Sequence, residues 1–124
     1  MGSIGLVIVS HSKHIAQGVV ELISEVAKDV SITYVGGTKD GGIGTSFDQV
    51  DRVVSENPAD TLLAFFDLGS AKMNLEMVAD FSDKSIIINR VPIVEGAYTA
   101  AALLQAGAEL SVIQTQLAEL EINK

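Results

Sequence analysis

The stretch "IGLVIV" at residues 4–9 runs directly into "SHS" at residues 10–12, and this change from apolar to polar decides the fold. The apolar run is continuous and does not alternate, which is typical of a strand covered on both faces of a parallel sheet. Three more runs have the same character: "SITYV" at 31–35, "TLLAFF" at 61–66 and "SIIIN" at 85–89. The sequence therefore predicts four buried strands.

Helical patterns separate these strands, because apolar residues recur between them at spacings of three and four. Thr45 and Asp48 form a capping box that predicts the start of the second helix. The other predicted features are a first stripe of Val19, Leu22, Ile23 and Val26 following Ile15, a second of Phe47, Val50, Val53 and Val54, a third helix from Ser70, and an alanine-rich fourth helix over 97–104 that ends at Gly107.

Alternation of strands and helices predicts an α/β fold with a doubly wound, mainly parallel four-stranded sheet flanked by helices. An extra C-terminal helix follows, with a narrow apolar seam of Leu110, Ile113, Leu117 and Leu120. That seam could close the core or pair with a second subunit, and the sequence does not decide between the two. Because 124 residues suit one core, we expect a single domain over 1–124.

The composition excludes several classes of partner. Eight lysines and arginines stand against sixteen acidic residues, which gives a net charge of -8 and argues against nucleic acid and membrane surfaces. The chain contains no cysteine, so disulfides and thiolate chemistry are excluded. No apolar stretch reaches the roughly 18 to 20 residues of a membrane-spanning helix. We therefore expect a cytoplasmic protein.

Two side chains with catalytic potential follow predicted strands. His11 lies two residues after the first strand, and Asp67 lies one residue after the third. In open α/β sheets ligands bind beyond the carboxyl ends of the strands, and neighbouring strands are only about 4.8 Å apart. A carboxylate on one imidazole nitrogen fixes the tautomer and leaves the other nitrogen nucleophilic. If the two strands are neighbours, the pair is a nucleophile with its orienting group.

The loops around this pair are rich in hydrogen-bond donors. They supply Ser12 beside the histidine, "GGIGTS" at 41–46, and Gly69 with Ser70. Helices begin here, and helix N-termini favour a phosphoryl group. The stretch "GGTKDGGIGTS" at 36–46 matches neither a Walker loop nor a dinucleotide loop, so we expect no binding of ATP by this chain alone. No cluster of carboxylates with ligand spacing suggests a metal.

Structural explanations exist for the same residues. His11 could be a polar loop residue that at most hydrogen-bonds to a small anion, and Asp67 could cap the third helix. Thr45 is first of all a capping residue, and the glycines could serve only to form turns. His14 falls in the first helical turn, where we expect it to be partly exposed and outside the site.

Four motifs together resemble a known family. They are "LVIVSHS" at 6–12, "IGTS" at 43–46, "FDLGSA" at 66–71 and "VPIVEGAYTAA" at 91–101. In this order they are similar to the DhaM family, the phosphotransferase subunits of bacterial phosphoenolpyruvate-dependent dihydroxyacetone kinases. The fold of that family resembles the mannose-type EIIA domain of the sugar phosphotransferase system. The resemblance extends over nearly the whole chain.

This resemblance implies a phosphoryl relay. The carrier protein HPr would phosphorylate His11, and the phosphoryl group would pass to ADP, held with magnesium on the subunit DhaL. The resulting ATP would serve dihydroxyacetone bound to the subunit DhaK. The only group carried here would be the covalent phosphoryl group, which we expect on Nε2 with Nδ1 facing Asp67. Ser12, Thr45, Gly69 and Ser70 would surround the phosphoryl oxygens.

The resemblance leaves alternatives and further expectations. A mannose-type EIIA domain that donates to an EIIB partner is the runner-up, although "VSHS" and "PIVEG" favour the dihydroxyacetone branch. A regulatory module that binds a small anion without chemistry is a third reading. We expect a homodimer, HPr-like and enzyme I-like activities on separate proteins, and an apolar docking rim that includes Leu68, Ala71 or Met73. The resemblance gives no role to Glu95.

Overall fold

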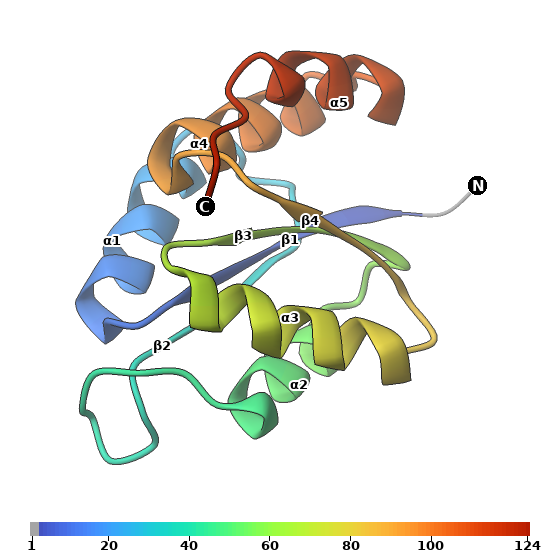
Figure 1. The fold of residues 1–124 in the computed structure, drawn as a ribbon. Coiled ribbons are helices and arrows are strands. Elements are labelled where there is room, and N and C mark those ends of the chain that lie inside the picture. The colour runs from blue at the N-terminus through green and yellow to red at the C-terminus, as the bar shows by residue number, and fades with distance from the viewer. Residues whose placement is uncertain (1–2) are drawn as a thin grey trace.

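The computed structural model describes residues 3–124 and contains four strands and five helices (Figure 1). Met1 and Gly2 of the predicted domain lie outside the described residues. In chain order the elements are β1 (Ile4–Ser10), α1 (Lys13–Ser24), β2 (Ile32–Gly36), α2 (Phe47–Glu56), β3 (Thr61–Phe66), α3 (Gly69–Phe81), β4 (Ser85–Asn89), α4 (Ile93–Gln105) and α5 (Leu110–Ala118).

The sheet is doubly wound, as the alternation of elements predicts. Its strand order is β2-β1-β3-β4, and all neighbouring strands are parallel. Helices α1, α4 and α5 cover one face and helices α2 and α3 cover the other (Figure 1). The chain moves outward from β1 to β2 and then returns to the other side with β3. The strand order therefore reverses between β1 and β3, the point at which such sheets bind ligands.

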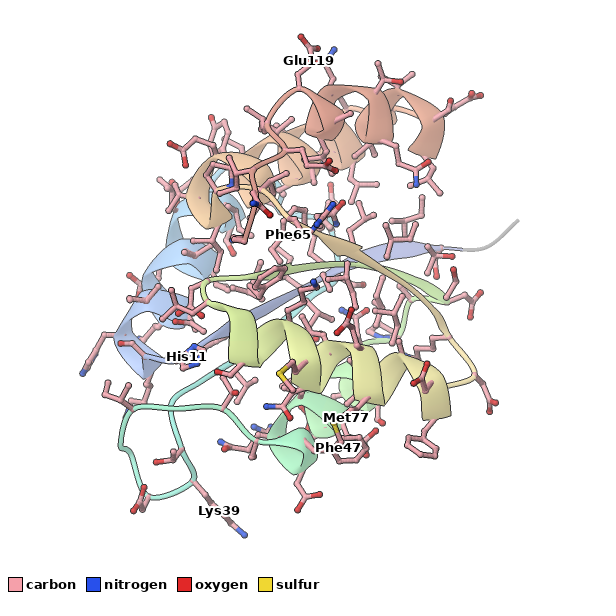
Figure 2. All side chains as sticks on the ribbon, viewed as in Figure 1. His11, Lys39, Phe47, Phe65, Met77 and Glu119 are labelled. Atoms are coloured by element: carbon pink, nitrogen blue, oxygen red, sulfur yellow. The ribbon has the colours of Figure 1, made fainter. Side chains whose placement is uncertain are left out.

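Two hydrophobic cores hold the layers together, one on each face of the sheet. Leu6 and Ile8 of β1 face the core under α1, α4 and α5, whereas Val7 and Val9 face the core under α2 and α3. Figure 2 shows Phe65 in the first core. Because successive strand residues point to opposite faces, burial on both faces requires a continuous apolar run. This explains the apolar runs of the central strands β1 and β3, whereas the edge strands β2 and β4 are only partly buried and were wrongly predicted as buried.

Helix α5 resolves the alternative left open by its apolar seam. Ile113 and Leu117 are buried in the core formed with α1 and α4. Leu110 and Leu120 are partly buried against the same core, so the seam closes the chain's own core. None of the helices within residues 3–124 has the length and hydrophobicity required to cross a membrane.

Some details of the predicted helices are wrong. In the first stripe Leu22 is 47% exposed, and Val26 lies beyond the end of α1. The buried side chains of this segment are instead two small residues, Ala16 and Ala27, together with Val19 and Ile23.

The predicted start of α2 is displaced by one residue. Its N-cap is Ser46, whose hydroxyl accepts from the amide of Gln49, so α2 is capped by Ser46 and not by a box of Thr45 and Asp48. The hydroxyl of Thr45 therefore does not cap α2 and is free to make another contact. Helix α3 begins at Gly69, one residue before the predicted Ser70.

Candidate functional site

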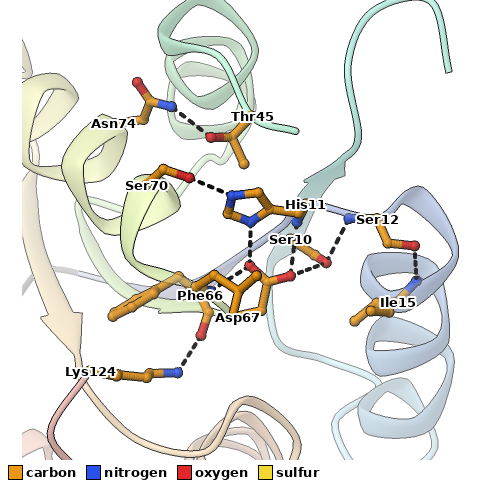
Figure 3. Close-up of polar contacts among 11 residues, drawn as sticks. Ser10, His11, Ser12, Ile15, Thr45, Phe66, Asp67, Ser70, Asn74 and Lys124 are labelled. Carbon is orange, nitrogen blue, oxygen red and sulfur yellow. Dashed lines mark hydrogen bonds and ion pairs between the residues drawn. The ribbon is translucent and has the colours of Figure 1, made fainter. Parts of the chain in front are cut away.

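His11 and Asp67 meet at the carboxyl edge of the two central strands. The last paired residues of these strands are Val9 and Phe66, so the chain on each side has only one or two residues to travel before it reaches the site. The Nδ1 atom of His11 lies 2.8 Å from Oδ1 of Asp67 (Figure 3). The contact predicted from strand order is therefore confirmed, with Nδ1 facing the carboxylate.

The carboxylate of Asp67 is held by four hydrogen bonds. Oδ2 accepts from the hydroxyl of Ser10 at 2.7 Å and from the backbone amide of His11 at 2.9 Å. Oδ1 accepts from Nδ1 of His11 and from the amide of Leu68. Burial by itself would raise the pKa of Asp67, but the hydrogen bonds from Ser10, His11 and Leu68 outweigh burial and hold the pKa below its usual value. Asp67 is thus a fixed anion.

The position of Asp67 also decides the capping alternative. The N-cap of α3 is Leu68, which makes no side-chain capping bond. Within the backbone of its own turn, Asp67 accepts only from the amide of Leu68, the residue that directly follows it. The carboxylate is oriented toward His11 and Ser10, so its geometry is that of an orienting group for the imidazole.

This arrangement fixes the tautomer of the neutral imidazole. A carboxylate only accepts hydrogen bonds, so Nδ1 carries the proton and Nε2 of the neutral ring has a lone pair. The Ser70 hydroxyl lies within hydrogen-bond distance of Nε2 and donates to that lone pair. The side chain of His11 is 16% exposed, so the ring is held on one side and open on the other. Nε2 is therefore the ring nitrogen that keeps a lone pair.

Thr45 lies on the Nε2 side of the site and contacts Asn74, a residue that was not predicted from the sequence (Figure 3). Its hydroxyl accepts from the side-chain amide of Asn74 at 2.8 Å. Asn74 lies four residues after Ser70, on the same face of α3. Figure 3 shows Ser70, Thr45 and Asn74 on the side of the ring that carries Nε2. The loop before α2 is tied to α3 by this contact.

Ser10 and Ser12 have structural contacts beside the histidine. The hydroxyl of Ser12 caps α1 by accepting from the amide of Ile15, and the amide of Ser12 donates to the hydroxyl of Ser10. The buried Ser10 in turn donates to Asp67. The structure thus places the predicted phosphoryl contact Ser12 in a helix cap, whereas Ser10 supports the carboxylate directly.

The remaining predicted residues are distributed around the opening. Gly69 is the exposed first residue of α3, where backbone amides have no intrahelical acceptor. His14 is exposed in the first turn of α1. Among the predicted rim residues Leu68 and Met73 are more than half exposed, but Ala71 is fully buried in the core and cannot belong to a rim. 

One exposed apolar residue was not predicted from the sequence. Ile43, in the loop before α2, is 76% exposed. Within residues 3–124 no three histidine or acidic side chains come together in a way that could hold a metal ion.

A glycine at the end of β2 allows the site to form. A Cβ atom placed on Gly36 would lie 2.4 Å from the carbonyl oxygen of Ser12 and 2.8 Å from Cα of Lys13. These are backbone atoms of the turn that carries His11 into α1, so they cannot move aside as a flexible side chain would. Gly36 is therefore required for the close approach of β2 to this turn.

Replacing Gly36 with alanine is expected to lower the free energy of unfolding by about 1–3 kcal/mol, because the added Cβ atom must displace the backbone at Ser12. Urea unfolding measures the change. The matched control is Gly18→Ala on α1, where a Cβ atom meets nothing within 4 Å. That control is expected to raise stability by about 0.5–1 kcal/mol. Equal stabilities for the two variants would contradict the close approach.

The hydrogen bonds of Asp67 predict a dependence of stability on pH. The pKa of Asp67 is lower in the folded chain than in the unfolded chain, so its stabilising contribution is complete above the unfolded pKa of about 4 and is lost as the pH falls toward the folded pKa. The excess stability of wild type over Asp67→Asn is therefore expected to shrink below about pH 4. Urea unfolding from pH 7 to pH 3 measures this excess, and a constant difference across that range would refute the account.

Comparisons with known proteins identify the chain's relatives. The family model of the EIIA-man family, described as the PTS system fructose IIA component, matches residues 5–114. The chain is 56% identical over 120 residues to a PTS-dependent dihydroxyacetone kinase, phosphotransferase subunit DhaM, of Lactococcus lactis subsp. lactis, and covers 98% of that protein. It is 52% identical over 118 residues to a PEP-dependent dihydroxyacetone kinase 1, phosphoryl donor subunit DhaM, of Listeria innocua, and covers 95% of it. These matches include 97% and 95% of the present chain.

Solved structures agree with these sequence relatives in fold. The crystal structure of an unknown function protein, EF1359, superposes with a TM-score of 0.82 at 30% identity, and the match covers 98% of this chain and 95% of that one. A sigma-54 interaction domain protein from Enterococcus faecalis superposes with a TM-score of 0.72 at 12% identity, over 94% of this chain and 89% of that one. The second likeness shows the fold alone.

Proposed function

Because this chain belongs to the EIIA-man family of PTS fructose IIA components, we propose that it is the phosphoryl donor subunit of a phosphoenolpyruvate-dependent dihydroxyacetone kinase. The family carries out phosphotransfer, and the relatives that match nearly the full length of the chain are phosphoryl donor subunits of that kinase. The whole of residues 1–124 would act as one phosphocarrier domain.

The observation that carries the proposal is the bond between Nδ1 of His11 and Asp67, which leaves Nε2 as the nucleophile. In the first step the lone pair of Nε2 attacks the phosphorus of a phosphohistidine on HPr. The new Nε2–P bond forms as the P–N bond of the donor breaks, and the electron pair of that bond returns to the donor imidazole. Nδ1 of His11 keeps its proton throughout, because Asp67 accepts it as a hydrogen bond.

In the second step the phosphoryl group leaves for the acceptor. A terminal oxygen of ADP on the partner subunit DhaL attacks the phosphorus, the Nε2–P bond breaks, and its electron pair returns to Nε2. The transition state of such transfers is loose, so positioning and electrostatic stabilisation matter more than covalent machinery. Ser70, Thr45 and the amide of Gly69 are the groups we assign to the transferred oxygens. We assign no contact with these oxygens to the Ser12 hydroxyl, because it caps α1.

The surroundings of His11 suit a reaction between proteins. A hollow of about 600 Å³ lies against β2 and is lined by residues of α1 and α2, but His11 is not part of its lining. The segments that contact His11 and Asp67 instead carry exposed apolar side chains, which are Ile43 in the loop before α2 and Leu68 and Met73 at the start of α3. Exposed apolar side chains next to a reactive group are typical of surfaces that dock other proteins. 

Several further features belong to the same proposal. Nucleotide and magnesium would be bound by DhaL, and dihydroxyacetone by DhaK, while this chain carries only the covalent phosphoryl group. The reaction would take place in the cytoplasm, where HPr is found. A homodimer remains part of the proposal through the resemblance alone, because the seam of α5 is used inside the chain.

Intact-mass measurement with fragment mapping tests the proposal. The purified chain is incubated with enzyme I, HPr and phosphoenolpyruvate at neutral pH and then mixed with ADP-loaded DhaL. The expected result is an acid-labile phosphate on His11 that disappears when DhaL is added, together with formation of ATP.

Other outcomes distinguish the alternatives. Transfer to an EIIB domain but not to DhaL would assign the chain to the mannose-type branch. Phosphorylation of HPr without any phosphate on this chain would leave His11 as a residue that only binds an anion, and the phosphocarrier function would be rejected.

A further inference from the structure

The segment that follows α5 returns to the site. The amide of Ile122 donates to the carbonyl of Arg90 at 2.9 Å, and the guanidinium of Arg90 lies 3.8 Å from the carboxylate of Glu121. These contacts direct the segment across the end of β4. Figure 1 shows the C-terminal end close to the turn between β3 and α3, which carries Asp67.

Lys124, which follows in this segment, contacts Phe66, the residue before Asp67. Its ammonium group donates to the carbonyl oxygen of Phe66 at 2.6 Å and lies 4.3 Å from the centre of the Phe66 ring (Figure 3). That carbonyl belongs to the peptide group that joins Phe66 to Asp67. The contact therefore fixes the backbone that presents the carboxylate to His11, and the aromatic face adds a favourable cation–π interaction.

The charges of Lys124 and Asp67 also act on each other. Burial lowers the pKa of Lys124, and the negative charge of Asp67 opposes that change. The ammonium group lies at the Phe66 side of the carboxylate, whereas His11 contacts the carboxylate through Oδ1. Asp67 thus contacts an imidazole through its side chain and follows a peptide carbonyl that binds a cation.

This arrangement matters because a carboxylate has two opposed effects on a nucleophilic histidine. It fixes the useful tautomer, but it also favours the imidazolium, in which Nε2 has lost its lone pair. A cation behind the carboxylate counteracts the second effect without disturbing the first. The same cation offsets part of the negative charge that a phosphoryl group brings to the site.

We propose that Lys124 is a positioning residue for phosphoryl transfer, which fixes the Phe66–Asp67 peptide and, by opposing the charge of Asp67, limits the influence of that carboxylate on the His11 ring. The proposal rests on the proposed function for its role in the reaction. Its electrostatic part concerns the chain alone and can be measured without any phosphoryl donor.

Other ionisable groups on the elements around His11 contribute to the same field. They are Lys13 and His14 on α1, Lys39 and Asp40 on the loop before α2, Lys72 on α3, and Glu95 at the start of α4. All of them are present in every variant below, so their contributions cancel when Lys124 variants are compared with wild type.

The first measurement is an NMR pH titration of the imidazole nitrogens in wild type, Lys124→Met, Lys124→Arg and Lys28→Met. Methionine keeps an apolar stem against Phe66 and removes the charge, whereas arginine keeps the charge. Lys28 is exposed in the turn between α1 and β2, at the opposite edge of the sheet, so its replacement controls for net charge. His14 is the internal reference.

In Lys124→Met the His11 ring is expected to take up its second proton about half a pH unit higher than in wild type, the size expected when one nearby charge is removed from a partly hydrated site. Lys124→Arg and Lys28→Met are expected to titrate as wild type does. An unchanged His11 midpoint in Lys124→Met, or an equal shift in Lys28→Met, would overturn the proposal.

The second measurement is the rate of phosphorylation by phosphoramidate, a small donor that needs no partner protein, between pH 6 and pH 9. Lys124→Met is expected to react about threefold more slowly at the acid end and as fast as wild type at the alkaline end, because half a pH unit corresponds to that factor. A reduction that is the same at every pH would mean that Lys124 only ties the backbone, and the electrostatic role would be rejected.

The two measurements separate the two hypotheses. If neither wild type nor any variant accepts phosphate on His11 from phosphoramidate or from HPr, the proposed function fails. The titration then still decides whether Lys124 controls the protonation of His11.

Discussion

Replacing His11 with glutamine is expected to abolish phosphorylation of the chain, with a loss of at least about 10³-fold. Glutamine keeps the polarity of the position but offers no imidazole lone pair for attack on phosphorus. The His11 side chain is partly exposed and belongs to neither core, so the fold is expected to remain intact. The reaction is followed by intact mass after incubation with HPr, enzyme I and phosphoenolpyruvate, and folding is checked by circular dichroism.

His14→Gln is the matched control for this experiment. His14 is exposed on α1 in the same chain, so its replacement is expected to leave phosphorylation at the wild-type level. A phosphate that persists in His11→Gln and disappears in His14→Gln would move the nucleophile to His14 and refute the assignment.

Replacing Asp67 with asparagine is expected to slow phosphorylation by about 10²- to 10³-fold, the second largest effect. The carboxylate accepts all four of its hydrogen bonds, two at each oxygen. An asparagine must direct its amide nitrogen toward one of these donor pairs. Either the His11 tautomer is no longer fixed, or the contacts to Ser10 and to the His11 backbone are lost.

The rate of phosphoryl uptake by Asp67→Asn measures this effect. Asp80→Asn is a suitable control, since Asp80 is exposed near the end of α3 and loses the same charge far along the helix from Asp67. Uptake at the wild-type rate in Asp67→Asn would mean that the carboxylate does not orient the nucleophile. A parallel loss in both variants would point to net charge instead of geometry.

The strands and the central pair could be predicted because their signals are local. Burial on both faces leaves a continuous apolar run in β3, and β3 and β4 both occupy the predicted residues, although β4 is an edge strand that is only partly buried. His11 and Asp67 stand directly after such runs, so only the neighbour relation of β1 and β3 was needed to bring them together. The structure supplies that relation through the pairing of Val9 with Phe66.

Features that depend on contacts between distant segments could not be predicted. Asn74 meets Thr45 across 29 residues, and Lys124 meets Phe66 across 58. In the sequence Gly36 looks like any other glycine at the end of a strand. Only the structure shows that the backbone of Ser12 leaves no room for a Cβ atom there. The cap of α2 was misplaced for a simpler reason: Thr45 and Ser46 are adjacent and both can cap, so the pattern admits two registers.

The division of the interior into two cores determines how long the His11–Asp67 pair persists. Strands β1 and β3 contribute to both cores, whereas each helix contributes to only one. If the helices on one face detach briefly, the ladder between β1 and β3 is still supported from the other face. Amides of these two strands therefore exchange with solvent mainly through global unfolding. His11 and Asp67, which follow these two strands, are thus expected to stay together when either layer of helices opens.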